Sequence, residues 1–139
     1  MAGPVLIDSG PLVALLNRDE HDHLWVLEQF KQLYAELRTC EAVISESFFL
    51  VRHNPHGIAA LLDLLDSGAI RLDFTLNGHL AVVTSLMRKY HDVPMSLADA
   101  CLVRMSELHD GARVFTLDSD FKLYRRHGRQ TIPMIYPAR

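Results

Sequence analysis

The chain has 139 residues, of which 49% are apolar and 22% charged; this composition excludes a globally disordered protein and allows one domain with an ordinary core. Its 14 Lys and Arg residues against 17 Asp and Glu residues give a net charge of −3, which argues mildly against binding nucleic acid through bulk positive charge. No apolar run approaches the ~20 residues that span a bilayer, and the start has no signal-peptide pattern. Cys40 and Cys101 form no CxxC motif and no disulfide framework. We therefore expect a single cytoplasmic domain over residues 1–139.

The first half of the chain predicts one short strand followed by helices. The stretch from Pro4 to Asp8 (PVLID) is strand-like and ends on an acid. A helix should follow it, with Gly10 as its N-cap and Pro11 in its first turn. Helical apolar spacing predicts a second helix over residues 23–37. A third helix is expected to begin near Ser45.

The second half continues the alternation of helices and strands. A helix is predicted from Ile58 to Leu65, closed by Ser67-Gly68, and strand-like IRLDF follows it. Two more helices and two strands are expected over residues 80–90, 97–108, 114–117 and 132–135. Short apolar strands that alternate with helices favour an α/β fold with a parallel sheet covered on both faces. In such sheets, ligands collect outside the carboxyl ends of the strands.

Five of the seventeen acids lie among apolar residues, where a carboxylate is partly desolvated and costly unless something compensates it. Asp8 follows the apolar run PVLI, and Asp118 follows VFTL with Asp120 two residues later. Glu46 lies within AVISESFFLV, and Asp99 is the only charge in SLADACLV. These five acids are the candidate site residues.

Each of these acids also has a purely structural interpretation. Asp8 and Asp118 could end strands and cap the turns that follow. Glu46 could favour the positive end of its helix. Ser96 and Asp99 fit the S-x-x-D capping box.

Taken together, the acids favour a metal site. Two of them end parallel strands, and two more are expected in the first turns of helices that start at the same edge of the sheet. Two unit charges ~4 Å apart repel by roughly 4 kcal/mol at an effective dielectric of about 20, so such a cluster needs cations. Hard oxygen ligands without histidine or cysteine favour Mg²⁺ or Mn²⁺. Carboxylate-held Mg²⁺ commonly hydrolyses phosphodiester bonds.

A basic segment follows the last acids. Without the five candidate acids the chain carries 14 basic and 12 acidic residues. The segment from Lys122 to Arg129 (KLYRRHGR) has four basic residues and no acid. It could follow a phosphate backbone beside the site, and the alternative is a solvated, basic helix end.

Four stretches in order, VLIDSGPLVALLNRDE, TCEAVISESFFLVR, SLADACLVRM and VFTLDSDFKLYRRHG, resemble the PIN domain family and, more narrowly, the ribonuclease toxins of VapBC toxin–antitoxin pairs. The resemblance implies a three-layer α/β/α sandwich with a central parallel sheet. It places the family's acidic quartet on Asp8, Glu46, Asp99 and Asp118, with Asp120 as a possible fifth ligand. It further implies Mg²⁺- or Mn²⁺-dependent endonucleolytic cleavage of RNA, homodimers, and an antitoxin whose tail occupies the acidic groove.

One position departs from the pattern of this family. Many members carry Ser or Thr two residues after the first Asp, where this chain has Gly10; its hydroxyl is on Ser9 instead, and Thr116 is a weaker candidate. Two alternatives to the nuclease remain. One is a catalytically silent PIN-fold module that binds RNA or protein, and the weaker one is a phosphoesterase acting on small phosphate esters.

Overall fold

A five-stranded parallel sheet forms the centre of the structure, a computed structural model that describes residues 3–138. Its strand order is β3-β2-β1-β4-β7, and every neighbouring pair is parallel. The strands are short: β1 Val5–Ile7, β2 Leu37–Arg38, β3 Ile70–Arg71, β4 Arg113–Phe115 and β7 Met134–Ile135. A separate antiparallel hairpin joins β5 (Arg125–Arg126) to β6 (Gln130–Thr131).

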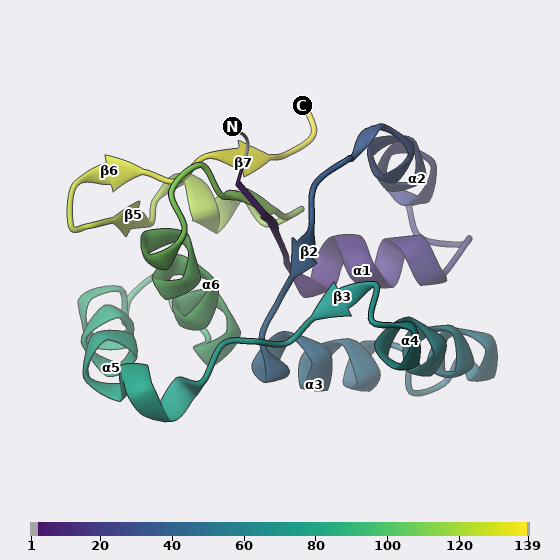
Figure 1. Cartoon of the computed structure of the whole chain (residues 1–139), viewed down its shortest axis with the longest axis horizontal. Coiled ribbons are helices and arrows are strands. Elements are labelled where there is room, and N and C mark those ends of the chain that lie inside the picture. Colours follow the sequence, from purple (N-terminus) through teal and green to yellow (C-terminus); the bar gives the residue numbers. More distant parts are fainter. Residues whose placement is uncertain (1–2, 139) are drawn as a thin grey trace.

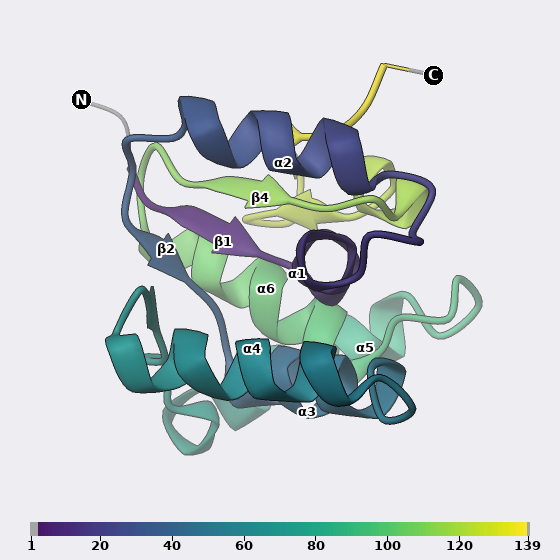
Figure 2. The same cartoon turned by 90° about the vertical axis from the view of Figure 1, so that its right-hand side faces the viewer.

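Helices cover both faces of this sheet (Figure 1). They are α1 Ser9–Leu16, α2 His23–Gln32, α3 Glu41–Leu50, α4 Pro55–Ser67, α5 Leu80–Lys89 and α6 Leu97–Leu108, with 3₁₀ turns at Leu76–His79 and Ser119–Lys122. Figure 2 shows α2 above β1 and β4, and α6 below them. This arrangement confirms the expected three-layer α/β/α fold. None of the helices within residues 3–138 is long and apolar enough to cross a membrane.

The alternation of side chains along β1 explains how the sheet joins the two outer layers. Val5 packs with Val26 of α2 and with Phe115 on one side. Leu6 points to the other side, where it joins the core formed with α6. Ile7 packs in a third apolar cluster, beside α1 and α4. Successive residues of a strand face opposite sides, and the three buried residues of β1 thus contribute to three apolar clusters. Because both faces of β1 are covered, all three of its residues are apolar.

The structure corrects three expected helix boundaries. The N-cap of α1 is Asp8 rather than Gly10. The second helix ends at Gln32, and Leu37 lies in β2 instead. The third helix begins at Glu41 rather than near Ser45, because Val43, Ile44 and Ser47 already face inward with helical spacing. Glu46 therefore lies in the middle of α3 and not in its first turn.

Strand lengths and the basic segment are also corrected. Of the expected strand IRLDF only Ile70–Arg71 pairs, and of residues 132–135 only Met134–Ile135 does. The basic segment is no helix end, because it runs from the end of a 3₁₀ turn into the β5–β6 hairpin. The stop at Ser67-Gly68 is confirmed: Gly68 adopts φ 74°, a left-handed conformation that favours glycine.

The start of α4 offers a stability test remote from the candidate acids. The helix starts at Pro55, earlier than expected, and the Asn54 side chain accepts a hydrogen bond from the Gly57 N–H at 3.1 Å. We expect Asn54→Ala to lower the free energy of unfolding by about 1 kcal/mol, measured in urea, because a helix N–H loses its partner. The control Asn77→Ala, at an exposed position, should change it by less than about 0.5 kcal/mol. Equal stability of the two variants would refute the role of this cap.

Candidate active site

The candidate site begins where β1 and β4 end. These strands are neighbours in register, with Ile7 opposite Phe115, and the Asp8 N–H donates to the Phe115 carbonyl at 2.9 Å. Asp8 follows β1 directly and is only 5% exposed. Its Oδ1 accepts a hydrogen bond from the Ser9 N–H at 2.8 Å and thereby caps α1. The extended strand thus delivers a buried carboxylate to the sheet edge.

One buried hydroxyl connects the two strand ends. Thr116 follows β4, is fully buried, and donates from Oγ1 to Asp8 Oδ2 at 2.8 Å. Thr116 Oγ1 also accepts a hydrogen bond from the Asp118 N–H at 3.0 Å. Asp118 Oδ1 in turn accepts from the Asp120 N–H at 2.9 Å, which closes the turn after β4. Thr116 therefore contacts two of the candidate acids.

Two helices supply the remaining acids. Asp99 lies in the first turn of α6, where it completes a capping box with Ser96, so the structural interpretation of this pair is confirmed. The hydroxyl of Tyr124 donates to Asp99 Oδ2 at 2.9 Å. Glu46 projects from the middle of α3, and its Oε1 accepts a hydrogen bond from the Ser9 hydroxyl. Ser9 thus brings a hydroxyl to the acids although the usual position is occupied by Gly10.

Burial and repulsion between carboxylates raise the pKa values of Asp8, Asp99 and Asp120. Burial raises the pKa of Asp8 to about 7, repulsion from Asp99 and Glu46 adds to this, and hydrogen bonds from Thr116 and Ser9 oppose it. Burial also raises the pKa of Asp99, and the nearby charge of Asp118 adds to the effect. Partial desolvation and Asp118 raise the pKa of Asp120. These interactions join all five carboxylates in one electrostatic cluster.

No salt bridge between the described residues neutralises this cluster. Within residues 3–138, none of the ion pairs involves any of the five acids; the pairs use Glu36, Asp73, Glu107 and Asp110 instead. Asp8 and Asp99 are buried, Glu46 and Asp120 half-buried, and Asp118 exposed. Buried charges are normally paired or coordinate metal ions. The cluster is therefore suited to an external cation or, in its absence, to a proton on Asp8.

The donor set fits a hard divalent cation in type and charge, because it consists of carboxylates and hydroxyls. Among the residues that the structure describes, however, no group of three or more His, Cys, Asp or Glu side chains is arranged to hold a metal ion as it stands. The hydroxyls of Ser9, Thr116 and Tyr124 each hold one of the acids. A cation would therefore have to draw the carboxylates closer together.

The structure brings the five predicted residues to one edge of the sheet from four separate segments of the chain. The prediction missed Tyr124 and undervalued Thr116. The spacing of Phe121 and Tyr124 indicates burial, and both are buried, but no sequence signal joins a tyrosine to an acid 25 residues earlier. The sequence does carry a signal for Thr116 as a candidate site residue, because it lies between the end of β4 and Asp118 and therefore at the carboxyl edge of the sheet.

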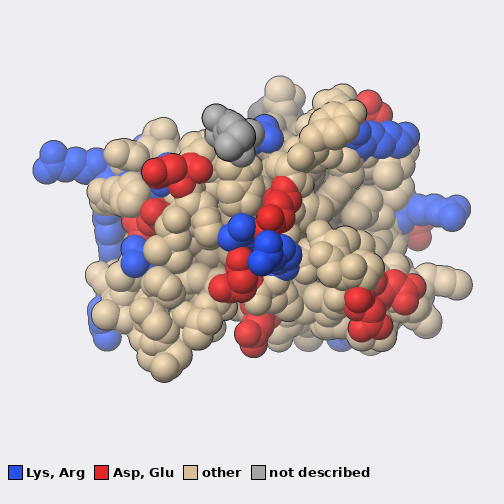
Figure 3. Space-filling view, in the orientation of Figure 1, with Lys and Arg blue, Asp and Glu red and all other residues tan. Residues whose placement is uncertain are grey.

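The basic segment is only partly available to a ligand. Arg125 donates from Nη1 to the carbonyls of Lys122 and Tyr124, at 2.8 and 3.0 Å. Arg126 is buried, and its Nε has no hydrogen-bond partner within the described chain. Lys122 and Arg129 remain exposed. Several basic side chains gather along the left edge of Figure 3, where Figure 1 places α5 and the β5–β6 hairpin.

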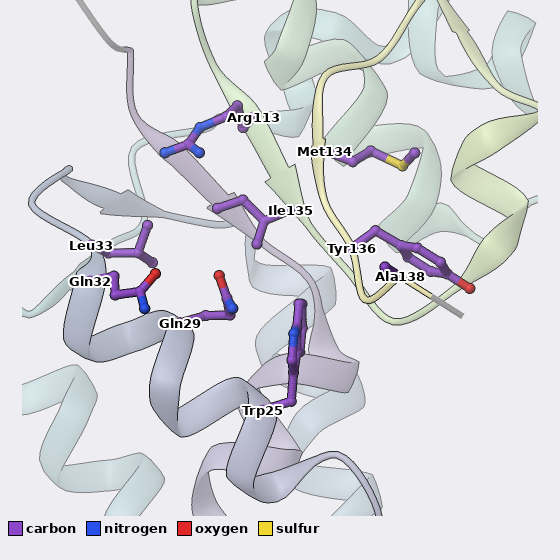
Figure 4. A pocket seen from close by; sticks show the side chains of 9 residues that line it. All are labelled: Trp25, Gln29, Gln32, Leu33, Arg113, Met134, Ile135, Tyr136 and Ala138. Carbon is purple, nitrogen blue, oxygen red and sulfur yellow. The ribbon is translucent and has the colours of Figure 1, made fainter.

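A pocket elsewhere on the molecule does not coincide with the acids. It lies between α2 and the edge strand β7 and is lined by Trp25, Gln29, Gln32, Leu33, Arg113, Met134, Ile135, Tyr136 and Ala138 (Figure 4). None of these residues is acidic. The pocket therefore offers no carboxylate ligand and is not the candidate metal site.

Comparison with known proteins agrees with this architecture. The model of the PIN domain family matches residues 5–126. No curated protein matches the chain in sequence. A similar solved structure is that of VapC20 from Mycobacterium tuberculosis, described as a Sarcin-Ricin loop cleaving toxin, with a TM-score of 0.76 and 15% identity over 86% of this chain and 93% of that chain. At this identity the likeness concerns the fold. The chain belongs to the PIN domain family.

Proposed function

We propose that this protein is a metal-dependent endoribonuclease, the toxin of a toxin–antitoxin pair. The observation that carries the proposal is the cluster of five acids at the carboxyl edge of a parallel sheet, none of which forms a salt bridge within residues 3–138. Membership of the PIN domain family and the fold of an RNA-cleaving toxin support the same class of reaction. The Sarcin-Ricin loop is the target of that other protein, and we do not transfer it.

In this proposal Asp8, Glu46, Asp99 and Asp118 hold Mg²⁺ or Mn²⁺, and Asp120 assists as a fifth ligand. When bound, such ions activate water for attack on phosphorus and stabilise the leaving oxygen. The side chain of Asp8 gives up its proton when the cation arrives, because its pKa of about 7 leaves it partly protonated near neutrality. The remaining hydrogen bonds orient the carboxylates.

The proposed nuclease function implies three kinds of partner: RNA, an antitoxin and a second copy of the chain. RNA would approach along the basic edge that includes the exposed Lys122 and Arg129, whose charges are suited to phosphates. A cognate antitoxin would cover the acids, and a second copy of the chain would complete a homodimer, both as the family resemblance implies. We propose the cytoplasm as the compartment in which these partners meet.

Incubation of the purified protein with a circular RNA tests the reaction, because only an endonuclease can open a circle. We expect cleavage in Mn²⁺ or Mg²⁺, its loss with excess EDTA, and its recovery when metal is restored. Cleavage that persists in EDTA would refute the metal mechanism. RNA binding without cleavage would favour the silent binding module, and hydrolysis of p-nitrophenyl phosphate alone would favour the small-ester phosphoesterase.

A further inference from the structure

Tyr124 is a buried phenol that reaches one of the candidate ligands. It lies just beyond the 3₁₀ turn that carries Asp120, and its side chain is fully buried. A buried tyrosine hydroxyl needs a hydrogen-bond partner, and here the partner is Asp99 Oδ2 at 2.9 Å. The hydrogen bond joins α6 to the segment that follows β4.

The position of the Tyr124 ring is fixed from two sides. The rings of Tyr90 and Phe121 each lie 5.1 Å from it, centroid to centroid, in edge-to-face contact. The Tyr90 hydroxyl is itself held, because it accepts a hydrogen bond from the Arg125 N–H at 3.0 Å. The phenol cannot move away from Asp99 without disturbing this packing.

The two oxygens of Asp99 are used unequally. Oδ2 accepts hydrogen bonds from both Tyr124 and the Ser96 N–H, the latter at 3.3 Å. The Ser96 side chain also interacts with the Asp99 carboxylate. Within residues 3–138, neither the Tyr124 hydroxyl nor the Ser96 N–H donates to Oδ1, and no ion pair includes Asp99. Oδ2 is thus held by two donors, and Oδ1, which receives neither of them, is the oxygen better placed for an external ligand.

We propose that Tyr124 is a positioning residue, which holds Asp99 by Oδ2 so that Oδ1 is its ligand oxygen. The inference rests on the proposed metal-dependent function and assigns it an additional residue. Hydrogen bonds of this kind orient ligands around a metal ion, and their loss typically weakens metal affinity by about 10–100-fold.

The variant Tyr124→Phe tests the proposal, with Tyr90→Phe as the matched control. Both changes remove one buried or half-buried phenol oxygen from the same aromatic cluster, but only the first removes a donor to a candidate ligand. Mn²⁺ dissociation constants would be measured by isothermal titration calorimetry on metal-free protein. We expect about a tenfold weaker affinity for Tyr124→Phe and a change below about twofold for Tyr90→Phe.

The outcomes separate this inference from the proposed function. Wild-type protein that binds no Mn²⁺ would overturn the metal-dependent function itself. Wild-type protein that binds Mn²⁺ with the same affinity as Tyr124→Phe would overturn only the role of Tyr124.

A crystal of the wild-type protein soaked in Mn²⁺ provides a test that needs no variant to fold. We expect Asp99 to bind through Oδ1 while Oδ2 keeps its hydrogen bond to Tyr124. Ligation through Oδ2, with the tyrosine hydroxyl displaced, would overturn the proposal.

Discussion

Asp8→Asn is expected to abolish RNA cleavage and at the same time to stabilise the metal-free protein at neutral pH. Activity falls because a proposed ligand loses its charge, and the loss should exceed the ~100-fold reached by removing a supporting hydrogen bond. Stability rises because ionising the buried Asp8 carboxyl costs free energy, as its raised pKa of about 7 indicates. Asparagine is uncharged, and its oxygen can still accept the hydrogen bond from Ser9.

Cleavage of circular RNA and thermal unfolding without metal measure the two effects on the same preparation. Asp63→Asn is the matched control, because it makes the same chemical change at an exposed position of α4. It should leave both quantities close to wild type. An Asp8→Asn variant that cuts RNA at the wild-type rate would rule out the assignment of this residue.

The metal-free wild-type protein is expected to lose stability as the pH rises from about 4 to about 7. The pKa of Asp8 is raised from 3.8 to about 7 in the folded state. Protonation therefore favours the folded state, and its contribution is complete below pH 3.8 and lost as the pH rises through 7. A difference of about three pKa units corresponds to at most about 4 kcal/mol.

Urea unfolding at several pH values would measure this dependence. Asp8→Asn should remove most of it, because the titrating group is gone. Saturating Mn²⁺ should also remove it in the wild-type protein, because the cation binds the ionised carboxylate. If wild type and Asp8→Asn showed the same dependence of stability on pH without metal, the burial of Asp8 would not be the cause of that dependence.

The acids could be predicted from the sequence because apolar neighbours flank them, although Asp118 itself is exposed and only Asp8 and Asp99 are buried. Asp8 directly follows the apolar strand β1, and Asp118 comes three residues after the end of β4, so both lie at the carboxyl edge of the parallel sheet. Glu46 lies close to Ser9 and Asp8, as expected, although α3 begins at Glu41 rather than near Ser45. A helix carries its side chain to the same neighbourhood whether it begins at Glu41 or Ser45.

Other features could not be predicted because they depend on contacts between distant segments. The strand β2 has only two residues, too few to show an alternating pattern, and it pairs with β1 and β3. Pairing with these two strands places Leu37 in the sheet, although the apolar spacing of the preceding residues is helical. The hydrogen bond from Tyr124 to Asp99 likewise joins two segments whose apolar surroundings show that each is buried and not that they meet.

Asp8 has two roles, and this limits which substitutions could remove the proposed activity without destabilising the fold. Its carboxylate is both the N-cap of α1 and a member of the acid cluster. Ser, Thr and Asn keep a side-chain oxygen for the cap, whereas Ala or Leu would also weaken the start of the helix. A relative that has become a silent binding module should thus carry one of these small polar residues at this position, and an inactive chain would be recognisable by it.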